Sequence, residues 1–215
     1  MELVRNLRAI QRLKREFNVY PFVLVVWAEP TLHHLYLFKY LQKEGYIDYF
    51  VGRYKLPEPH VGGTTYPESH NIRVGLTWAK ERWPTNSYVI VQAADVCPKP
   101  GLYKQIDGAM QGASACVCSW VNTLTSEPIY CTNLFAVSMD EKYWPPISPP
   151  DNHDVLEVQW SRQLPKESVV RLPLLFSHEH ADLFLPAYIE EQKDKEHARW
   201  GLGWLALLKK WVGWQ

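Results

Sequence analysis

Asp95 follows directly on an uncharged, apolar stretch, and its position suggests chemistry. Residues 88 to 92 (YVIVQ) are mostly β-branched or aromatic, which is typical of a buried strand. Pro98 and Pro100 stop that strand, and Gly101 opens a helical pattern. Open α/β sheets place their ligands just beyond the carboxyl ends of strands, where Asp95 lies. A carboxylate there could bind a ligand, or it could simply cap the next turn.

The elements that must position Asp95 alternate between helices and short apolar runs. We expect helices over residues 3–17, 35–43, 71–82, 102–110 and 151–163, and strands over 22–27, 47–51, 88–92, 115–121, 133–138 and 169–176. This alternation predicts an α/β fold: a three-layer α/β/α, mostly parallel, Rossmann-like sheet. The proline-rich stretch 56–69 is expected to be a long loop that could act as a lid.

Composition places the chain among ordinary globular proteins. Lys plus Arg (23) equal Asp plus Glu (23), so no net field would recruit a polyanion and nucleic-acid binding is disfavoured. The four cysteines form no CxxC pair, which favours buried reduced thiols over structural zinc. The charged N-terminal stretch is unlike a signal sequence, and no run of 18 apolar residues occurs. We therefore expect a cytoplasmic location.

The order of these motifs resembles that of the GT-A-type nucleotide-sugar glycosyltransferases, in a family 2-like form. In that family an N-x-G…A helix precedes a buried strand that ends in an acidic DxD-like motif. A proline-glycine turn and a helix follow, then an acid at the start of a helix, and finally a His after a strand. The matching segments are Asn71 to Ala79, VIVQAADVCPKPG at 89–101, DNHD at 151–154, and His178. The resemblance covers residues 1–185, which would form a catalytic domain, and residues 186–215 would form a C-terminal helical extension.

The resemblance implies a transferase that uses a nucleotide-diphospho-sugar donor. The leaving diphosphate needs a hard divalent cation, Mn²⁺ or Mg²⁺, and Asp95 and His178 are its implied ligands. Asp154, or failing it Asp151, is the implied base that accepts the proton of the acceptor hydroxyl. The residues implied to contact the nucleotide are Glu29, Arg73, Gln92 and Asp95.

Two departures from the family pattern favour a second hypothesis. Position 93 is Ala where the DxD-like motif has its first acid. The family's first strand, which precedes the helix matching residues 3–17, has no counterpart before Leu3. A non-catalytic GT-A-like subunit that binds a glycan or a partner protein would tolerate both departures.

A third hypothesis rests on residues 177–182 (SHEHAD), which resemble the HxHxD core of metallo-β-lactamase-type hydrolases. Two His and one Asp this close together could bind zinc. Position 183 is Leu where that family has His. Two solvated histidines at a sheet edge are the simpler interpretation.

Tryptophans raise two further possibilities. Trp144, in a proline-rich loop at 144–150, could stack on an acceptor sugar, whereas Trp120 and Trp160 are expected in the core. In residues 200–215, three Trp and two Leu share one helical face beside Lys209 and Lys210. Such a helix suits a membrane surface and a lipid-linked rather than a free glycan acceptor. Alternatively, it docks on this protein's own sheet or on a second copy in a homo-oligomer.

Overall fold

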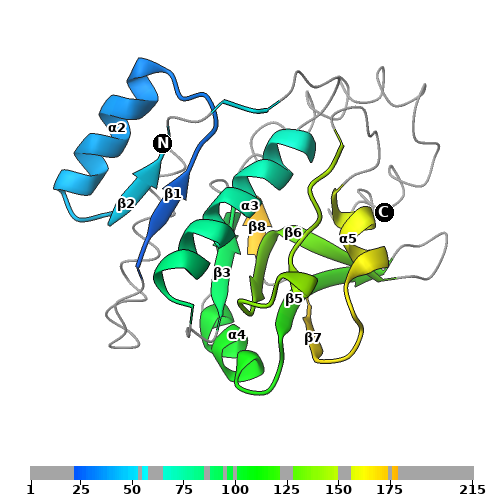
Figure 1. Cartoon of the computed structure of the whole chain (residues 1–215). Helices are drawn as coiled ribbons and strands as arrows, with labels where there is room; N and C mark the ends of the chain where they lie inside the picture. Colours follow the sequence, from blue (N-terminus) through cyan, green and yellow to red (C-terminus); the bar gives the residue numbers. More distant parts are fainter. Residues whose placement is uncertain are drawn as a thin grey trace, which may run out of the picture.

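Helices and short strands alternate along the chain, which confirms the prediction of a mixed α/β fold (Figure 1). The computed structural model describes residues 22–52, 55–57, 65–84, 88–93, 96–98, 101–121, 128–149, 156–173 and 176–178. The helices are α2 (Leu32–Lys43), α3 (Thr65–Arg82), α4 (Leu102–Met110), α5 (Leu156–Gln163) and the 3-10 helix η1 (Glu141–Tyr143). The strands are β1 (Leu24–Val26), β2 (Tyr49–Val51), β3 (Val89–Gln92), β4 (Val96–Pro98), β5 (Ala115–Val121), β6 (Pro128–Val137), β7 (Val169–Leu172) and β8 (Phe176–His178).

The largest sheet has the strand order β3-β6-β5-β7 and is mixed rather than mostly parallel. β6 runs antiparallel to both of its neighbours, β3 and β5, whereas β5 and β7 are parallel. β6 is antiparallel to β5 because the connection between them, residues 122–127, is short. A parallel return would need a crossover of about a dozen residues or more. β3, β5 and β7 therefore point the same way, with β6 inserted among them.

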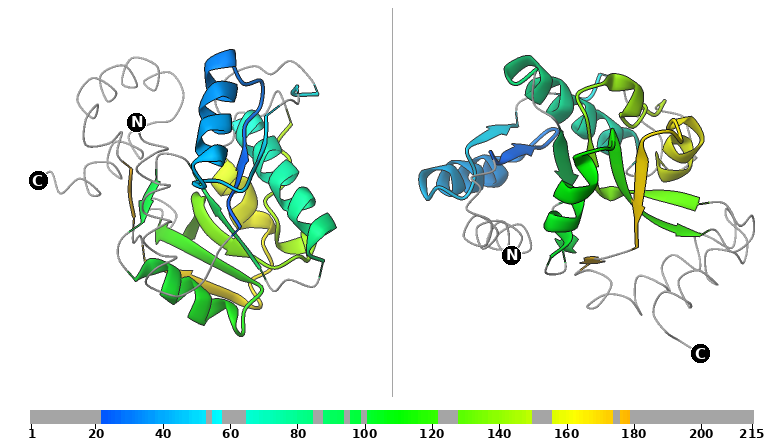
Figure 2. Two further views of the ribbon diagram at one scale, coloured as in Figure 1. Left: turned by 90° about the vertical axis from the view of Figure 1, so that its left-hand side faces the viewer. Right: turned by 90° about the horizontal axis from the view of Figure 1, so that it is seen from below.

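Two smaller sheets accompany the large one. β1 and β2 form a parallel pair, and β4 and β8 form an antiparallel pair. In the described part of the chain no strand pairing joins either pair to the large sheet. Helix α3 packs between β1 and the large sheet, and α2 lies outermost on the β1–β2 side (Figure 2). At Gly75 an added Cβ would lie 3.2 Å from Cγ2 of Val26, so this glycine lets α3 approach β1 closely.

Helices contact the large sheet through two separate clusters of buried residues. Alternate residues of β5 and β6 face opposite sides, as the period of a strand requires. Val117 and Phe135 pack with α3 and α5, whereas Cys116 and Leu134 pack with α4. A third cluster holds α2 on β1 through Phe38 and Leu41, which are 0% and 1% exposed.

Several element boundaries differ from the expected ones. α3 begins at Thr65, inside the expected loop 56–69. Pro67 is tolerated there because it lies in the first turn of the helix, where backbone N–H groups have no intrahelical partner. β6 is longer than the expected 133–138, and α2 begins three residues early, at Leu32, where Thr31 caps it. The expected strand 169–176 is β7 followed by the separate β8.

Some expected features lie outside the described residues. These are the helix over 3–17, most of the segment 177–182 and the helical extension 186–215. The division of the chain at residue 185 and the three-layer description therefore stay predictions.

Candidate functional site

Ala93 and Val96, which flank residues 94 and 95 in the sequence, close a turn that neighbouring residues hold in place. The Ala93 amide donates to the carbonyl of Asn133 on β6 (2.8 Å), and the Val96 amide donates to the carbonyl of Ala93 (3.2 Å). The Gln92 carboxamide donates from Nε2 to the Val96 carbonyl (3.1 Å) and accepts at Oε1 from the hydroxyl of Tyr103 on α4. Gln92 therefore ties β3, β4 and α4 together around this turn.

The β4–β8 pair brings two distant parts of the chain side by side. Val96 lies opposite His178 in the antiparallel register, and Cys97 lies opposite Ser177. Val96 is fully buried, which anchors β4 beneath α4. The residue after Asp95 and the backbone of the late histidine are therefore direct neighbours.

Two carboxylates converge on one buried hydroxyl of β6, in the large sheet. Oγ1 of Thr132, which is 2% exposed, lies 2.7 Å from Oε1 of Glu68 and 2.9 Å from Oε1 of Glu157. Glu68 belongs to the first turn of α3 and Glu157 to the first turn of α5. A hydroxyl has one hydrogen, so it can donate to one of these oxygens at a time.

This carboxylate pair lies close to the turn that Ala93 and Val96 close. Thr132 precedes Asn133, whose carbonyl accepts from Ala93, and Gln92 pairs with Leu134 on β6. The carboxyl end of β3 and the first turns of α3 and α5 therefore meet at one end of the large sheet. Acidic side chains gathered there can accept protons or bind the hydroxyls of a polar ligand.

The predicted nucleotide contacts fall in three different places. Gln92 lies at the edge just described, and its side chain is occupied in holding the turn. Glu29 is exposed at the tip of β1, with a left-handed φ of 48°. Arg73 donates from Nη2 to the carbonyl of Pro145 (3.2 Å), lies 3.6 Å from Glu141, and stacks over the Trp144 ring at 5.1 Å.

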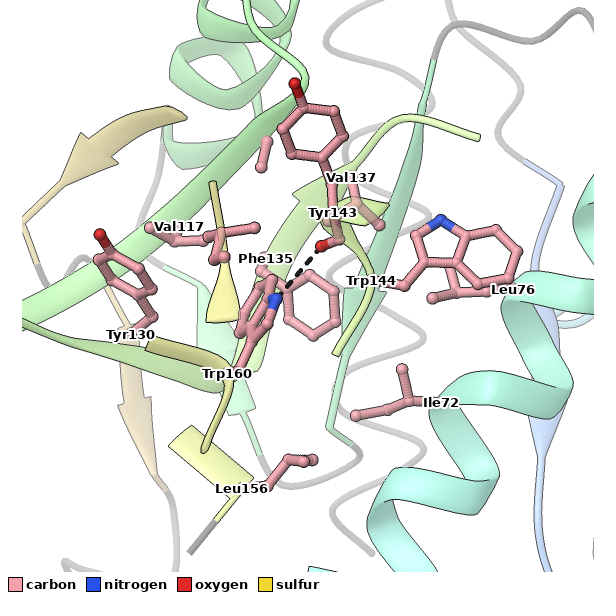
Figure 3. Close-up of a cluster of buried hydrophobic side chains, with 12 residues drawn as sticks. Ile72, Leu76, Val117, Tyr130, Phe135, Val137, Tyr143, Trp144, Leu156 and Trp160 are labelled. Atoms are coloured by element: carbon pink, nitrogen blue, oxygen red, sulfur yellow. Dashed lines mark hydrogen bonds between the residues drawn. The ribbon is translucent and has the colours of Figure 1, made fainter. Parts of the chain in front are cut away.

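The possible role of Trp144 in stacking on a sugar is wrong. Its side chain is 4% exposed, its Nε1 donates to the Ser138 carbonyl (2.9 Å), and it packs beside Leu76 of α3 (Figure 3). Trp160 is fully buried, as expected, and its Nε1 donates to the Tyr143 carbonyl (3.2 Å) in the same cluster (Figure 3). Trp144 therefore packs in the core and does not present its ring to solvent.

The prediction of buried reduced thiols is confirmed for the three cysteines whose side chains the structure describes. Cys116, Cys118 and Cys131 are free and buried in the cluster around α4. Burial raises the pKa of Cys116 and of Cys131 to about 12. They are neutral at physiological pH and are not nucleophiles.

The described residues contain no group of three or more His, Cys, Asp and Glu that could hold a metal ion. They also contain no helix long and apolar enough to cross a membrane. Asp95, Asp151 and Asp154 lie outside the described residues, and only the backbone of His178 is described. Their predicted roles stay predictions.

Sequence reasoning missed Glu68, Thr132, Glu157 and Tyr103. Glu68 lay in a stretch expected to be loop, and Thr132 preceded the expected start of its strand. The detectable signal was Glu157, an acid in the first turn of the helix that follows the DNHD segment. Only the packing of α3 and α5 against β6 brings the two acids together.

No family model matches the chain, and no curated protein is found to be similar to it. Among solved structures, one that it resembles is a glycosyltransferase involved in the glycosylation of the major capsid of PBCV-1. That structure is 12% identical in sequence, with a TM-score of 0.43, over 71% of this chain and 82% of that chain. The description of the fold therefore rests on the strands and helices themselves.

Proposed function

We propose that this protein is a glycosyltransferase that moves a sugar from a nucleotide-diphospho-sugar to an acceptor hydroxyl with the help of Mn²⁺ or Mg²⁺. The observation that carries the proposal is the pairing of β4 with β8, with Val96 opposite His178. The motif order predicted that the acid after the central strand and the late histidine act together. This pairing brings the segment that follows Asp95 beside the segment that contains His178, which supports a joint role for the two residues.

Asp95 and His178 would hold the cation. A carboxylate oxygen and an imidazole nitrogen form a donor set that suits Mn²⁺, and the remaining positions would be filled by phosphate oxygens and water. A bound cation would neutralise the charge that develops on the departing nucleoside diphosphate. The hydrogen bond from Gln92 to the Val96 carbonyl would hold the residue that follows the acid in place.

The base would come from the segment before α5. Asp151 and Asp154 precede Leu156, which is fully buried and anchors the start of α5. Glu157, one residue later, lies at Thr132 beside the end of β3. A carboxylate just before α5 would therefore enter the same edge of the sheet and could accept the proton of a glycan or lipid-linked acceptor.

A thermal-shift measurement with uridine, guanosine, cytidine and thymidine diphosphates, with and without Mn²⁺, tests the donor site. One of them should stabilise the protein only with metal, by about 2.7 kcal/mol at roughly 100 times its dissociation constant. Asp95→Asn and His178→Gln should each abolish the metal-dependent shift, whereas the exposed Glu167→Gln should leave it unchanged.

The outcomes separate the three hypotheses. Full transfer activity in Asp95→Asn would rule out the metal role of that residue. A flat response to every nucleotide would favour a non-catalytic subunit that binds a glycan or a partner. Zinc at one equivalent per chain that is lost in His180→Ala would instead favour the hydrolase.

A further inference from the structure

Helix α2 presents a row of large apolar side chains to solvent. Leu32 and Tyr36 are each 71% exposed, and Tyr40 is 57% exposed. They follow one another at intervals of four residues, so they lie along one side of the helix. The opposite side is the one that holds α2 in place, through the buried Phe38 and Leu41. The exposed row is therefore not needed for packing within the described part of the protein.

Lysines interleave with this row. At 100° per residue, Leu32, Tyr36, Lys39 and Lys43 fall within about 60° of one another around the helix axis, and Tyr40 lies beside them. Both lysines are exposed. Helix α2 contains no Asp or Glu, and the nearest acids, Glu29 and Glu44, lie beyond its two ends. The outer face of α2, defined by these five residues, is therefore both apolar and cationic.

This face also has an unobstructed position among the described elements. α2 lies at the outer edge of the molecule, with β1 and β2 between it and α3 (Figures 1 and 2). A flat surface could approach α2 along its length without meeting the large sheet or its helices.

We propose that the outer face of α2 binds an anionic lipid surface. Tyrosine suits the boundary between headgroups and acyl chains, because its ring is apolar and its hydroxyl is polar. Leu32 adds apolar area, and the two lysines pair with lipid phosphates and carboxylates while their stems lie along the apolar row. The whole chain has equal numbers of acidic and basic residues, so its net charge does not attract it to an anionic surface.

Charge argues against two other occupants of this face. One is the segment of residues 1–21, which carries an excess of three positive charges, the same sign as the outer face of α2 (Arg5, Arg8, Arg12, Lys14 and Arg15 against Glu2 and Glu16). A second copy paired through α2 would bring Lys39 and Lys43 towards the same two residues of its partner. Like charges in close contact oppose both arrangements.

The test is binding of the full chain to vesicles of phosphatidylcholine alone and of phosphatidylcholine with phosphatidylserine. The protein should bind the second kind more tightly, and added salt should weaken this binding. Lys39→Gln with Lys43→Gln should lower the affinity by roughly fivefold for each lysine removed. Tyr36→Ser with Tyr40→Ser should also lower it, with unchanged circular dichroism because both side chains face solvent.

Two controls make the result specific to α2. Lys104→Gln with Lys166→Gln removes the same charge from exposed positions elsewhere and should keep the wild-type affinity. Lys209→Gln with Lys210→Gln tests the C-terminal segment separately. The proposal is wrong if the wild-type chain does not prefer anionic vesicles, or if only the change at 209 and 210 lowers the affinity. It is also wrong if the α2 variants convert a dimer into a monomer, since a second copy then occupies this face.

Discussion

At the scale of single residues, the side chains with the clearest positioning role are ones that perform no chemistry themselves. Gln92 uses its donor and its acceptor at once, towards Val96 and Tyr103, and so links one strand, one turn and one helix. Thr132 offers one hydrogen to two carboxylates. Gln92 is the last residue of β3, and Thr132 lies on β6 next to Asn133, whose carbonyl accepts from Ala93.

Tyr103→Phe should loosen the turn that Ala93 and Val96 close. It removes the hydroxyl that donates to Gln92, and the loss of one such bond costs about 1 kcal/mol of folding free energy. Hydrogen exchange at the Val96 amide should speed up, and urea unfolding should shift to a lower midpoint. Tyr88→Phe is the matched control, since its hydroxyl donates to Asp107 elsewhere on α4 and its loss should leave the Val96 amide protected. Equal exchange at Val96 in both variants would contradict the positioning role.

Thr132→Val should destabilise the protein, whereas Glu157→Gln should be tolerated better. Valine leaves two partly buried carboxylates without the hydroxyl that they share, at a cost of roughly 1–3 kcal/mol. Glutamine at 157 supplies a donor and removes one of the two like charges. The free energy of unfolding by urea measures both effects. A larger loss of stability in Glu157→Gln than in Thr132→Val would contradict the stabilising role of the Thr132 hydroxyl.

At the scale of elements, helix α3 determines how the small sheet sits against the large one. Its residues Ile72 and Leu76 pack on the large sheet, while Gly75 faces Val26 of β1. A helix that packs against two sheets needs a small residue where it contacts the second sheet closely. The glycine therefore reflects packing rather than a turn.

Glycine-to-alanine changes in two helices should have different outcomes. Gly108→Ala in α4 meets open space and should stabilise the protein by about 0.5–1 kcal/mol, because alanine is the better helix former. Gly75→Ala places a methyl group 3.2 Å from the stiff Val26 side chain, so the helix-propensity gain should be largely offset. Thermal melts of both variants measure this, and an equal gain at the two positions would show that α3 and β1 are not closely packed.

At the scale of the whole molecule, stability should depend on alkaline pH through the buried thiols. Burial raises the pKa of Cys116 and Cys131 from 9.0 to about 12 in the folded protein, so unfolding releases protons above pH 9. Their contribution to stability is complete below pH 9 and is lost as the pH rises towards 12.

Urea unfolding between pH 8 and pH 12 should therefore show a falling free energy of unfolding, and Cys116→Ala with Cys131→Ala should flatten that fall. In the folded protein at pH 8 both thiols should resist a thiol reagent. Fast labelling of either cysteine would contradict their burial in the cluster around α4.

The sequence by itself determined the class of fold and most of its elements. Apolar runs and helical periodicity are local, so they correctly predicted both bounds of β5 and the last residue of α2, α3 and α4. The place of Asp95 beyond β3 followed from the same local pattern. The burial of the cysteines followed from their apolar surroundings.

Only the tertiary structure decided what meets at the end of β3. The pairing of β4 with β8, the antiparallel insertion of β6 and the convergence of Glu68 and Glu157 on Thr132 join residues far apart in the chain. The burial of Trp144 likewise depends on α3 lying over its loop. Such contacts depend on how helices and strands pack, and a single sequence holds no periodic signal for that packing.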